Sequence, residues 1–161
     1  MPKRELIVDP SLYDPGKPIA TLEDIRKFNA HRFEMELLTG ILLEDYETKT
    51  AVGYLQTSVN DFWVRGHMPG FPLLPGVLMC EVAAQLTGYV ANKYDLMSGG
   101  ILGLAGLDEV RFRGVVHPGD LLVVQTRLLY CKKMLIAGEF IELVGNDIVC
   151  EGIVKGVPLQ K

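Results

Sequence analysis

The stretch GHMPGFPLLPGVLMCEVAAQL, from Gly66 to Leu86, is the part of the chain that says most about its fold. Its first part, Gly66–Gly76, holds three prolines and three glycines. Because proline removes a backbone donor and glycine admits unusual dihedral angles, this part predicts a stiff loop. From Val77 the chain is a nearly all-apolar run of helix formers, which predicts a buried helix that ends near Asp95.

Two titratable side chains stand out in this stretch, His67 in the loop and Glu81 in the helix. A lone histidine is usually structural, but the rigid loop beside a helix start favours a catalytic base. Glu81 is either a hydrogen-bonded buried polar group or an acid whose pKa burial should raise. Gln85 lies one turn further on the same face, where it would orient Glu81 rather than react.

The start of the predicted helix adds a third chemical element. Pro75 suits the first turn, and the free N–H groups of Gly76, Val77 and Leu78 form a potential anion site that the helix dipole reinforces. A base, an acid and such amides within one short segment suit proton abstraction next to a carbonyl group.

Bulk properties limit the class of protein. A length of 161 residues with 48% hydrophobic residues and a mean hydropathy of +0.21 predicts one domain with a real core. The apolar excess also suggests that surface is shared with another subunit. A net charge of −4 argues against nucleic acid as a general partner.

Cysteine and histidine usage points away from metals and secretion. Three scattered cysteines indicate neither disulfides nor a zinc site, and favour a reducing cytoplasm. Three scattered histidines form no recognisable metal site, so we expect no metal. The N-terminus lacks the apolar run of a signal peptide, and no stretch is long enough to predict a transmembrane helix.

Along the chain, we expect an irregular arm over residues 1–20 and one domain over residues 21–161. A short helix should run from Thr21 to about Asn29, with a helical turn over 61–65. We predict turns at 98–100, 115–120, 132–133 and 145–147. Strands are expected over residues 33–46, 51–59, 101–113, 120–131, 134–144 and 148–157. One buried helix followed by a meander of strands predicts an α+β fold with the sheet wrapped around the helix.

The pattern His-x-Pro-Gly-x-Pro-x-x-Pro-Gly-Val-Leu-x-x-Glu-x-x-Ala-Gln, from His67 to Gln85, resembles the signature of the (3R)-hydroxyacyl-[acyl-carrier-protein] dehydratases of fatty acid synthesis. The resemblance extends over roughly residues 22–159. It implies the hotdog fold, a homodimer that is often one of three in a hexamer, and acyl carrier protein as partner. It also implies that no cofactor is needed, because the substrate is a thioester on phosphopantetheine.

The resemblance assigns roles within the site. His67 and Glu81 would be catalytic, each site taking them from opposite subunits, and Gly76 and Val77 would supply oxyanion donors. Met68 and Phe71 depart from the family pattern and would reshape the substrate channel. The departures therefore leave the preferred acyl chain length open.

Several other residues remain open. His31 is interpreted as a residue of a structural turn, with the wall of an acyl channel as the alternative. Cys80 is expected to be a buried packing residue and His117 a surface turn residue. Four basic residues could contact phosphopantetheine or an acidic carrier, or form a solvated face: Arg111, Arg113, Lys132 and Lys133.

Three rival functions remain. A dehydratase that also isomerises the double bond typically has Asp at the acid position, so Glu81 argues against it. A hotdog thioesterase would release a free thiol. A non-catalytic acyl-binding module would bind acyl thioesters without turning them over.

Overall fold

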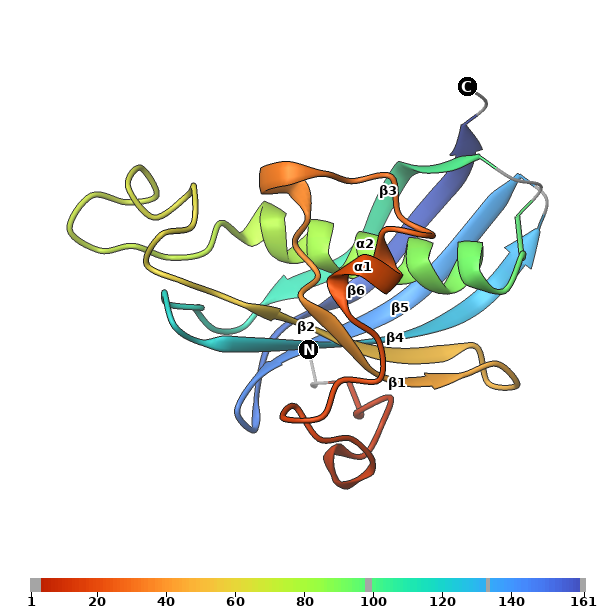
Figure 1. The fold of residues 1–161 in the computed structure, drawn as a ribbon, viewed down its shortest axis with the longest axis horizontal. Coiled ribbons are helices and arrows are strands. Elements are labelled where there is room, and N and C mark those ends of the chain that lie inside the picture. Colours follow the sequence, from red (N-terminus) through yellow and green to blue (C-terminus); the bar gives the residue numbers. More distant parts are fainter. Residues whose placement is uncertain (1–3, 98–99, 133, 160–161) are drawn as a thin grey trace.

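In the computed structural model, which describes residues 4–97, 100–132 and 134–159, one long helix lies against a curved sheet (Figure 1). The six strands are antiparallel in the order β1-β2-β4-β5-β6-β3. The predicted α+β fold, a sheet wrapped around a helix, is confirmed. The strands are β1 (Gly40–Asp45), β2 (Thr50–Gln56), β3 (Ile101–Phe112), β4 (Leu121–Lys132), β5 (Leu135–Val144) and β6 (Asp147–Leu159).

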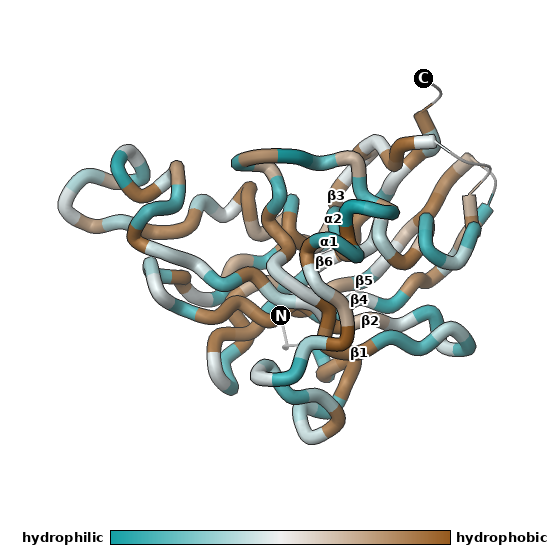
Figure 2. The backbone as a smooth tube through the Cα atoms, in the orientation of Figure 1, coloured by the Kyte–Doolittle hydropathy of each residue, from teal (hydrophilic) through white to brown (hydrophobic). Residues whose placement is uncertain are grey.

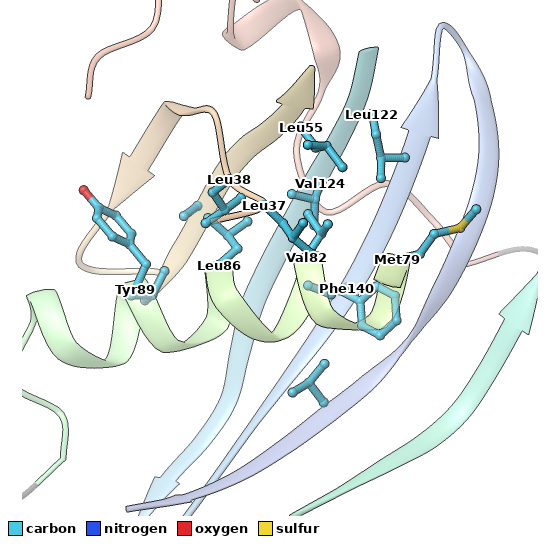
Figure 3. Close-up of a cluster of buried hydrophobic side chains, with 14 of the residues drawn as sticks. Leu37, Leu38, Leu55, Met79, Val82, Leu86, Tyr89, Leu122, Val124 and Phe140 are labelled. Carbon is cyan, nitrogen blue, oxygen red and sulfur yellow. The ribbon is translucent and has the colours of Figure 1, made fainter. Parts of the chain in front are cut away.

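The long helix is α2 (Gly76–Lys93), and its side chains form the centre of the core. Figure 3 shows Val82 and Leu86 of α2 among side chains from the sheet and from the segment before β1. Both are fully buried, as is Phe140 of β5. Burying one such side chain contributes about 1.5–3 kcal/mol, so this contact holds helix and sheet together. No helix in the described ranges is long and apolar enough to cross a membrane.

The later strands follow the predicted ranges to within a few residues, and the turn at 145–147 is confirmed. Figure 2 shows hydrophobic residues along the strands and hydrophilic residues in the turn between β1 and β2. Ser98 and Gly99 of one predicted turn, and Lys133 of another, lie outside the described residues. Lys132 of that second turn belongs to β4.

Three early elements differ from the predictions. The predicted strand from residue 33 was wrong at its start, because the chain forms a short helix, η2 (Phe33–Met35), and β1 begins only at Gly40. Between them, the Leu37 N–H donates to the side chain of Gln85 instead of to a neighbouring strand. Residues 61–65 form turns rather than a helical turn, and α1 (Leu22–Ile25) stops before the predicted end.

The N-terminal arm, including a short helix η1 (Pro10–Leu12), covers the face of the sheet opposite α2 (Figure 1). Gln125 of β4 is fully buried beneath it. Its side-chain oxygen accepts the N–H groups of Ile7 and Val8, each at 3.0 Å, and its nitrogen donates to the Val8 carbonyl at 2.8 Å. The arm thereby buries Val8 in a second apolar cluster with Leu42, Val52, Val123, Ile141, Leu143 and Ile148.

A buried acid lies in the interior of the sheet. Glu142 of β5 is inaccessible to solvent, and neither carboxyl oxygen has a partner at hydrogen-bonding distance among the described residues. Burial and the neighbouring Cys80 raise the pKa of Glu142 well above its ordinary value, and the Cys150 thiol offsets this only in part. Cys80 and Cys150 are buried, and Cys80 therefore fits its expected place as a packing residue.

We predict that Gln125→Ala lowers the free energy of unfolding by about 1–3 kcal/mol, because it leaves buried N–H groups of the arm without an acceptor. Urea denaturation measures the loss. Gln56→Ala is the matched control, since Gln56 is exposed, and it should cost less than about 1 kcal/mol. An equal loss in both variants would contradict the role given to Gln125.

We predict that Glu142→Gln stabilises the protein more at pH 8 than at pH 5. Above the ordinary glutamate pKa of 4.5, the unfolded chain loses the Glu142 proton while the folded protein keeps it. Wild-type stability should therefore fall as pH rises through this window, and the variant should escape that fall by about 1–3 kcal/mol. Urea denaturation at both pH values is the measurement, with Glu47→Gln on an exposed turn as control. A stability difference that is the same at both pH values would rule out the linkage.

Candidate active site

Glu81 lies in the second turn of α2, and its carboxyl group is held by two side chains. Its Oε1 atom accepts a hydrogen bond from Gln85 Nε2 at 2.9 Å and lies 3.2 Å from His31 Nε2. The side chain keeps 24% of its exposure, so it is accessible from a cavity and not sealed in the core. The site therefore offers a carboxyl group with a fixed orientation.

Gln85 links Glu81 to the segment that precedes β1. Its Nε2 atom also donates to the Met35 carbonyl at 2.7 Å, and its Oε1 atom accepts the Leu37 N–H at 3.1 Å. Only 2% of Gln85 is exposed. Because every polar atom of the amide is engaged, Gln85 has one orientation, and it presents a donor to Glu81.

The expectation that burial leaves Glu81 with a raised pKa was wrong. Burial does act in that direction and is the largest single effect. However, the hydrogen bonds from His31 and Gln85 and the attraction to His31 together outweigh it, so the pKa of Glu81 lies below its ordinary value. Glu81 is therefore a carboxylate at neutral pH in this structure.

The proximity of His31 to Glu81 was missed in the sequence, where His31 was interpreted as a turn residue. Fifty positions separate the two residues, and no local pattern relates them. The Asn29 side chain explains the contact, because its Nδ2 atom donates to the Gln85 carbonyl at 3.0 Å and ties the chain after α1 to α2. The alternative interpretation of His31 as part of the wall of an acyl channel came nearer, since His31 lines the cavity beside Glu81.

A cavity of about 190 Å³ opens beside Glu81. Apolar side chains line part of it, including Phe28, Ala84, Leu102, Leu104 and Val154, and polar side chains such as Asn29, Asn92 and Lys155 line the rest. They come from the chain after α1, from α2, and from β3 and β6. His31, Glu81 and Gln85 line the same cavity, whereas His67 does not. Within one protomer, the structure thus brings Glu81 and Gln85 together and leaves His67 outside their cavity.

His67 lies in the loop that projects beyond the sheet between β2 and α2 (Figure 1). Its backbone N–H donates to the Trp63 carbonyl, and its own carbonyl accepts the Leu73 N–H, each at 2.8 Å. The ring Nδ1 atom lies 2.9 Å from the Leu73 carbonyl oxygen, which can only accept. Nδ1 must therefore carry a proton, and the neutral ring has its lone pair on Nε2, where a base needs it.

The N-terminus of α2 presents free backbone donors. The N–H groups of Gly76 and Val77 have no partner in the described part of the chain. The expectation of a free N–H at Leu78 was wrong, because it donates to the Pro75 carbonyl at 2.9 Å, as the Met79 N–H does at 3.3 Å. A Cβ atom at Gly76 would lie 2.9 Å from the Phe112 ring of β3, so any other residue here would force that ring to move. With Val77 74% exposed, an anionic oxygen can reach these donors.

The two candidate channel residues lie on the projecting loop, away from the cavity beside Glu81. Met68 and Phe71 exchange backbone hydrogen bonds across a tight turn, and about half of each side chain is exposed. The Phe71 ring packs edge-on against the His117 ring, with centroids 6.0 Å apart. Among the basic candidates, Arg113 forms an ion pair with Glu151 at 2.6 Å. Lys133 lies outside the described residues.

A curved sheet around one helix, with a carboxyl group of that helix beside an apolar cavity, defines a hotdog-fold protein. The solved structures agree. A chain of the dehydratase heterocomplex ApeI:P from Xenorhabdus doucetiae superposes with a TM-score of 0.72 at 18% identity, covering 85% of this chain and 91% of that one. At that identity, the similarity shows the fold alone, and it confirms the predicted one.

Sequence comparisons identify the family. The FabA-like domain matches residues 29–153. The 3-hydroxyacyl-[acyl-carrier-protein] dehydratase FabZ of Caldicellulosiruptor bescii is 34% identical over 131 residues, or 81% of this chain and 93% of that protein. FabZ of Clostridioides difficile (strain 630) is 33% identical over 131 residues, or 81% and 92%. The chain belongs to the FabA-like family, as its signature from His67 to Gln85 predicted.

Proposed function

We propose that the protein is a dehydratase that removes water from (3R)-hydroxyacyl thioesters carried on acyl carrier protein and gives trans-2-enoyl thioesters for fatty acid synthesis. Membership of the FabA-like family and the FabZ relatives support the reaction. The observation that carries the mechanism is the tautomer of His67, whose bond to the Leu73 carbonyl leaves Nε2 as a free base. A FabA-like chain without such a base could bind acyl thioesters without turning them over.

Each part of the site has one role in the reaction. The thioester oxygen accepts the N–H groups of Gly76 and Val77, which stabilise the enolate-like charge. His67 Nε2 takes the C2 proton, and the electrons of that C–H bond form the C2–C3 double bond. The C3–O bond breaks with its electrons on oxygen, and Glu81 supplies the proton that makes the leaving group water. No cofactor enters these steps.

Glu81 must be protonated for that last step, although it is ionised in the free protein. Entry of an acyl chain into the cavity of about 190 Å³ displaces water from the carboxyl group. Loss of hydration disfavours the charged form and raises the pKa of a carboxyl group. The apolar side chains of Phe28, Leu102 and Leu104 in its lining fit an alkyl chain.

The site is completed by a second copy of the chain. β3 is an edge strand of twelve residues, and it exposes Leu104, Leu107 and Phe112. A long apolar edge strand with free backbone groups tends to pair with another strand. Pairing of the β3 strands of two copies would therefore form the homodimer. In that dimer the loop with His67 reaches the Glu81 cavity of the other protomer. A trimer of such dimers is the higher assembly, and acyl carrier protein is the partner in the cytoplasm.

We predict that His67→Ala and Glu81→Gln each lower kcat by about 100-fold to 10,000-fold, as expected for a lost general base or acid. Hydration of a short trans-2-enoyl thioester, on carrier protein and on CoA, is the assay. Size-exclusion chromatography controls for assembly. A wild type that releases free thiol would contradict the proposal in favour of a thioesterase, and one that binds substrate without turnover would favour a binding module.

We predict that mixing the two inactive variants restores activity if the site is shared. In a mixed dimer, one site receives both mutations, and the other receives an intact His67 and an intact Glu81. Random exchange of subunits makes half of the dimers mixed, so about one quarter of the wild-type activity should return. The measurement is activity after unfolding and refolding the two variants together, with each refolded alone as control. No recovery despite mixed dimers would show that each site lies within one protomer.

A further inference from the structure

We propose that His31 is a positioning residue: with Gln85 it occupies Oε1 of Glu81, so that the other carboxyl oxygen, Oε2, is the one presented to the substrate. This inference rests on the proposed function, in which Glu81 supplies the proton that turns the leaving hydroxyl group into water. The contact itself is independent of that function, because it is a property of the folded chain.

Both donors approach the same oxygen. Gln85 Nε2 lies 2.9 Å and His31 Nε2 lies 3.2 Å from Oε1 of Glu81. No hydrogen bond to Oε2 occurs within the described part of the chain. Because a carboxyl group is flat and its two oxygens exchange places on rotation, two donors on one oxygen oppose that rotation. The result is one anchored oxygen and one free oxygen beside the cavity.

The ring of His31 has to donate in this arrangement. Its Nδ1 atom is buried and has no hydrogen-bond partner among the described residues. Placing the only proton on Nδ1 would bury an unpaired N–H and set the Nε2 lone pair against a carboxylate oxygen. A neutral ring with its proton on Nε2 avoids both costs, and in the protonated ring Nε2 still donates to Glu81 while the Nδ1 proton stays without a partner among the described residues. His31 therefore acts on Glu81 as a donor.

The segment that carries His31 is itself fixed to α2. Asn29, which is 7% exposed, donates to the Gln85 carbonyl at 3.0 Å. Arg32 Nη1 donates to the carbonyl groups of Asn29 and His31, at 2.9 Å and 2.6 Å. The two donors to Glu81 thus come from segments that are tied to each other, and the distance between them is set by the fold.

Other charged groups near the pair are already engaged. Lys155 of β6 lines the same cavity and forms an ion pair with Asp108 of β3. Arg26 and Glu36 line a second, smaller cavity together with His31, and Arg26 Nε lies 2.5 Å from Glu36 Oε2. His31 and Gln85 are therefore the groups whose removal should change the charge and orientation of Glu81 most directly.

The kinetic test compares His31→Ala with His31→Gln. A mispositioned catalytic group costs rate more than binding, so His31→Ala should lower kcat about 10-fold to 100-fold while KM changes less than about 3-fold. His31→Gln, which returns an amide donor, should recover most of kcat. Ile25→Val is the matched control, because it loosens the core at the end of α1 without removing a donor to Glu81, and its kcat should stay within about 2-fold of wild type.

A second readout does not require turnover. Bonds to the ionised form hold the pKa of Glu81 down, so removing one of them should raise it. Carbon-13 NMR of protein labelled at the glutamate carboxyl carbon follows this titration, and Glu81→Gln identifies the signal. We expect an upward shift of the Glu81 pKa in His31→Ala and a return toward the wild-type value in His31→Gln.

The two readouts separate the possible failures. An unchanged Glu81 titration in His31→Ala overturns the positioning role, even if kcat falls, because the loss would then be structural. Equal kcat in His31→Ala and wild type overturns it as well. A third outcome is a shifted Glu81 pKa in His31→Ala together with a wild-type protein that turns over no hydroxyacyl or enoyl thioester. That outcome supports the positioning role and rejects the proposed dehydratase function.

Discussion

The burial of α2 against the curved sheet is the constraint on which the rest of this structure depends. The helix is too apolar to face water, and the sheet wraps around it to cover Val82 and Leu86. Covering the helix also buries the surroundings of Glu81, which then needs partners. Gln85 and His31 supply them. The His31 contact, and the bonds of Gln85 to Met35 and Leu37, also tie other segments to the helix. Packing and site geometry thus have the same origin.

The parts of the fold with a local cause could be predicted from the sequence. The prolines and glycines of Gly66–Gly76 forced a loop, and the apolar run after it forced a helix, so α2 was predicted closely. The later strands were bounded by clear turn residues. The start of β1 failed because a side chain, Gln85, replaced the neighbouring strand as hydrogen-bond partner of Leu37. A pattern of hydrophobic residues cannot show that a side chain takes the place of a strand as hydrogen-bond partner.

The same distinction applies to the site. The residues from His67 to Gln85 could be selected in the sequence because they lie in one short segment. The contact between His31 and Glu81 could not, since it depends on how the chain after α1 docks on α2. The wrong direction for the pKa of Glu81 has that same cause. Burial of Glu81 can be inferred from its apolar neighbours in sequence. That the hydrogen bonds from His31 and Gln85 together lower its pKa by more than burial raises it can be seen only in the folded structure.

The hold of Gln125 on the arm has a consequence for how this chain can diverge. A buried amide on the outer face of the sheet is tolerable only while the backbone of Ile7 and Val8 occupies its donors and acceptors. Deleting the arm would leave the Gln125 amide without these hydrogen-bond partners. An apolar side chain at position 125 would leave the arm without its anchoring hydrogen bonds. The conformation of the arm and the side chain at position 125 therefore depend on each other, and a change in one alters the energetic cost of the other.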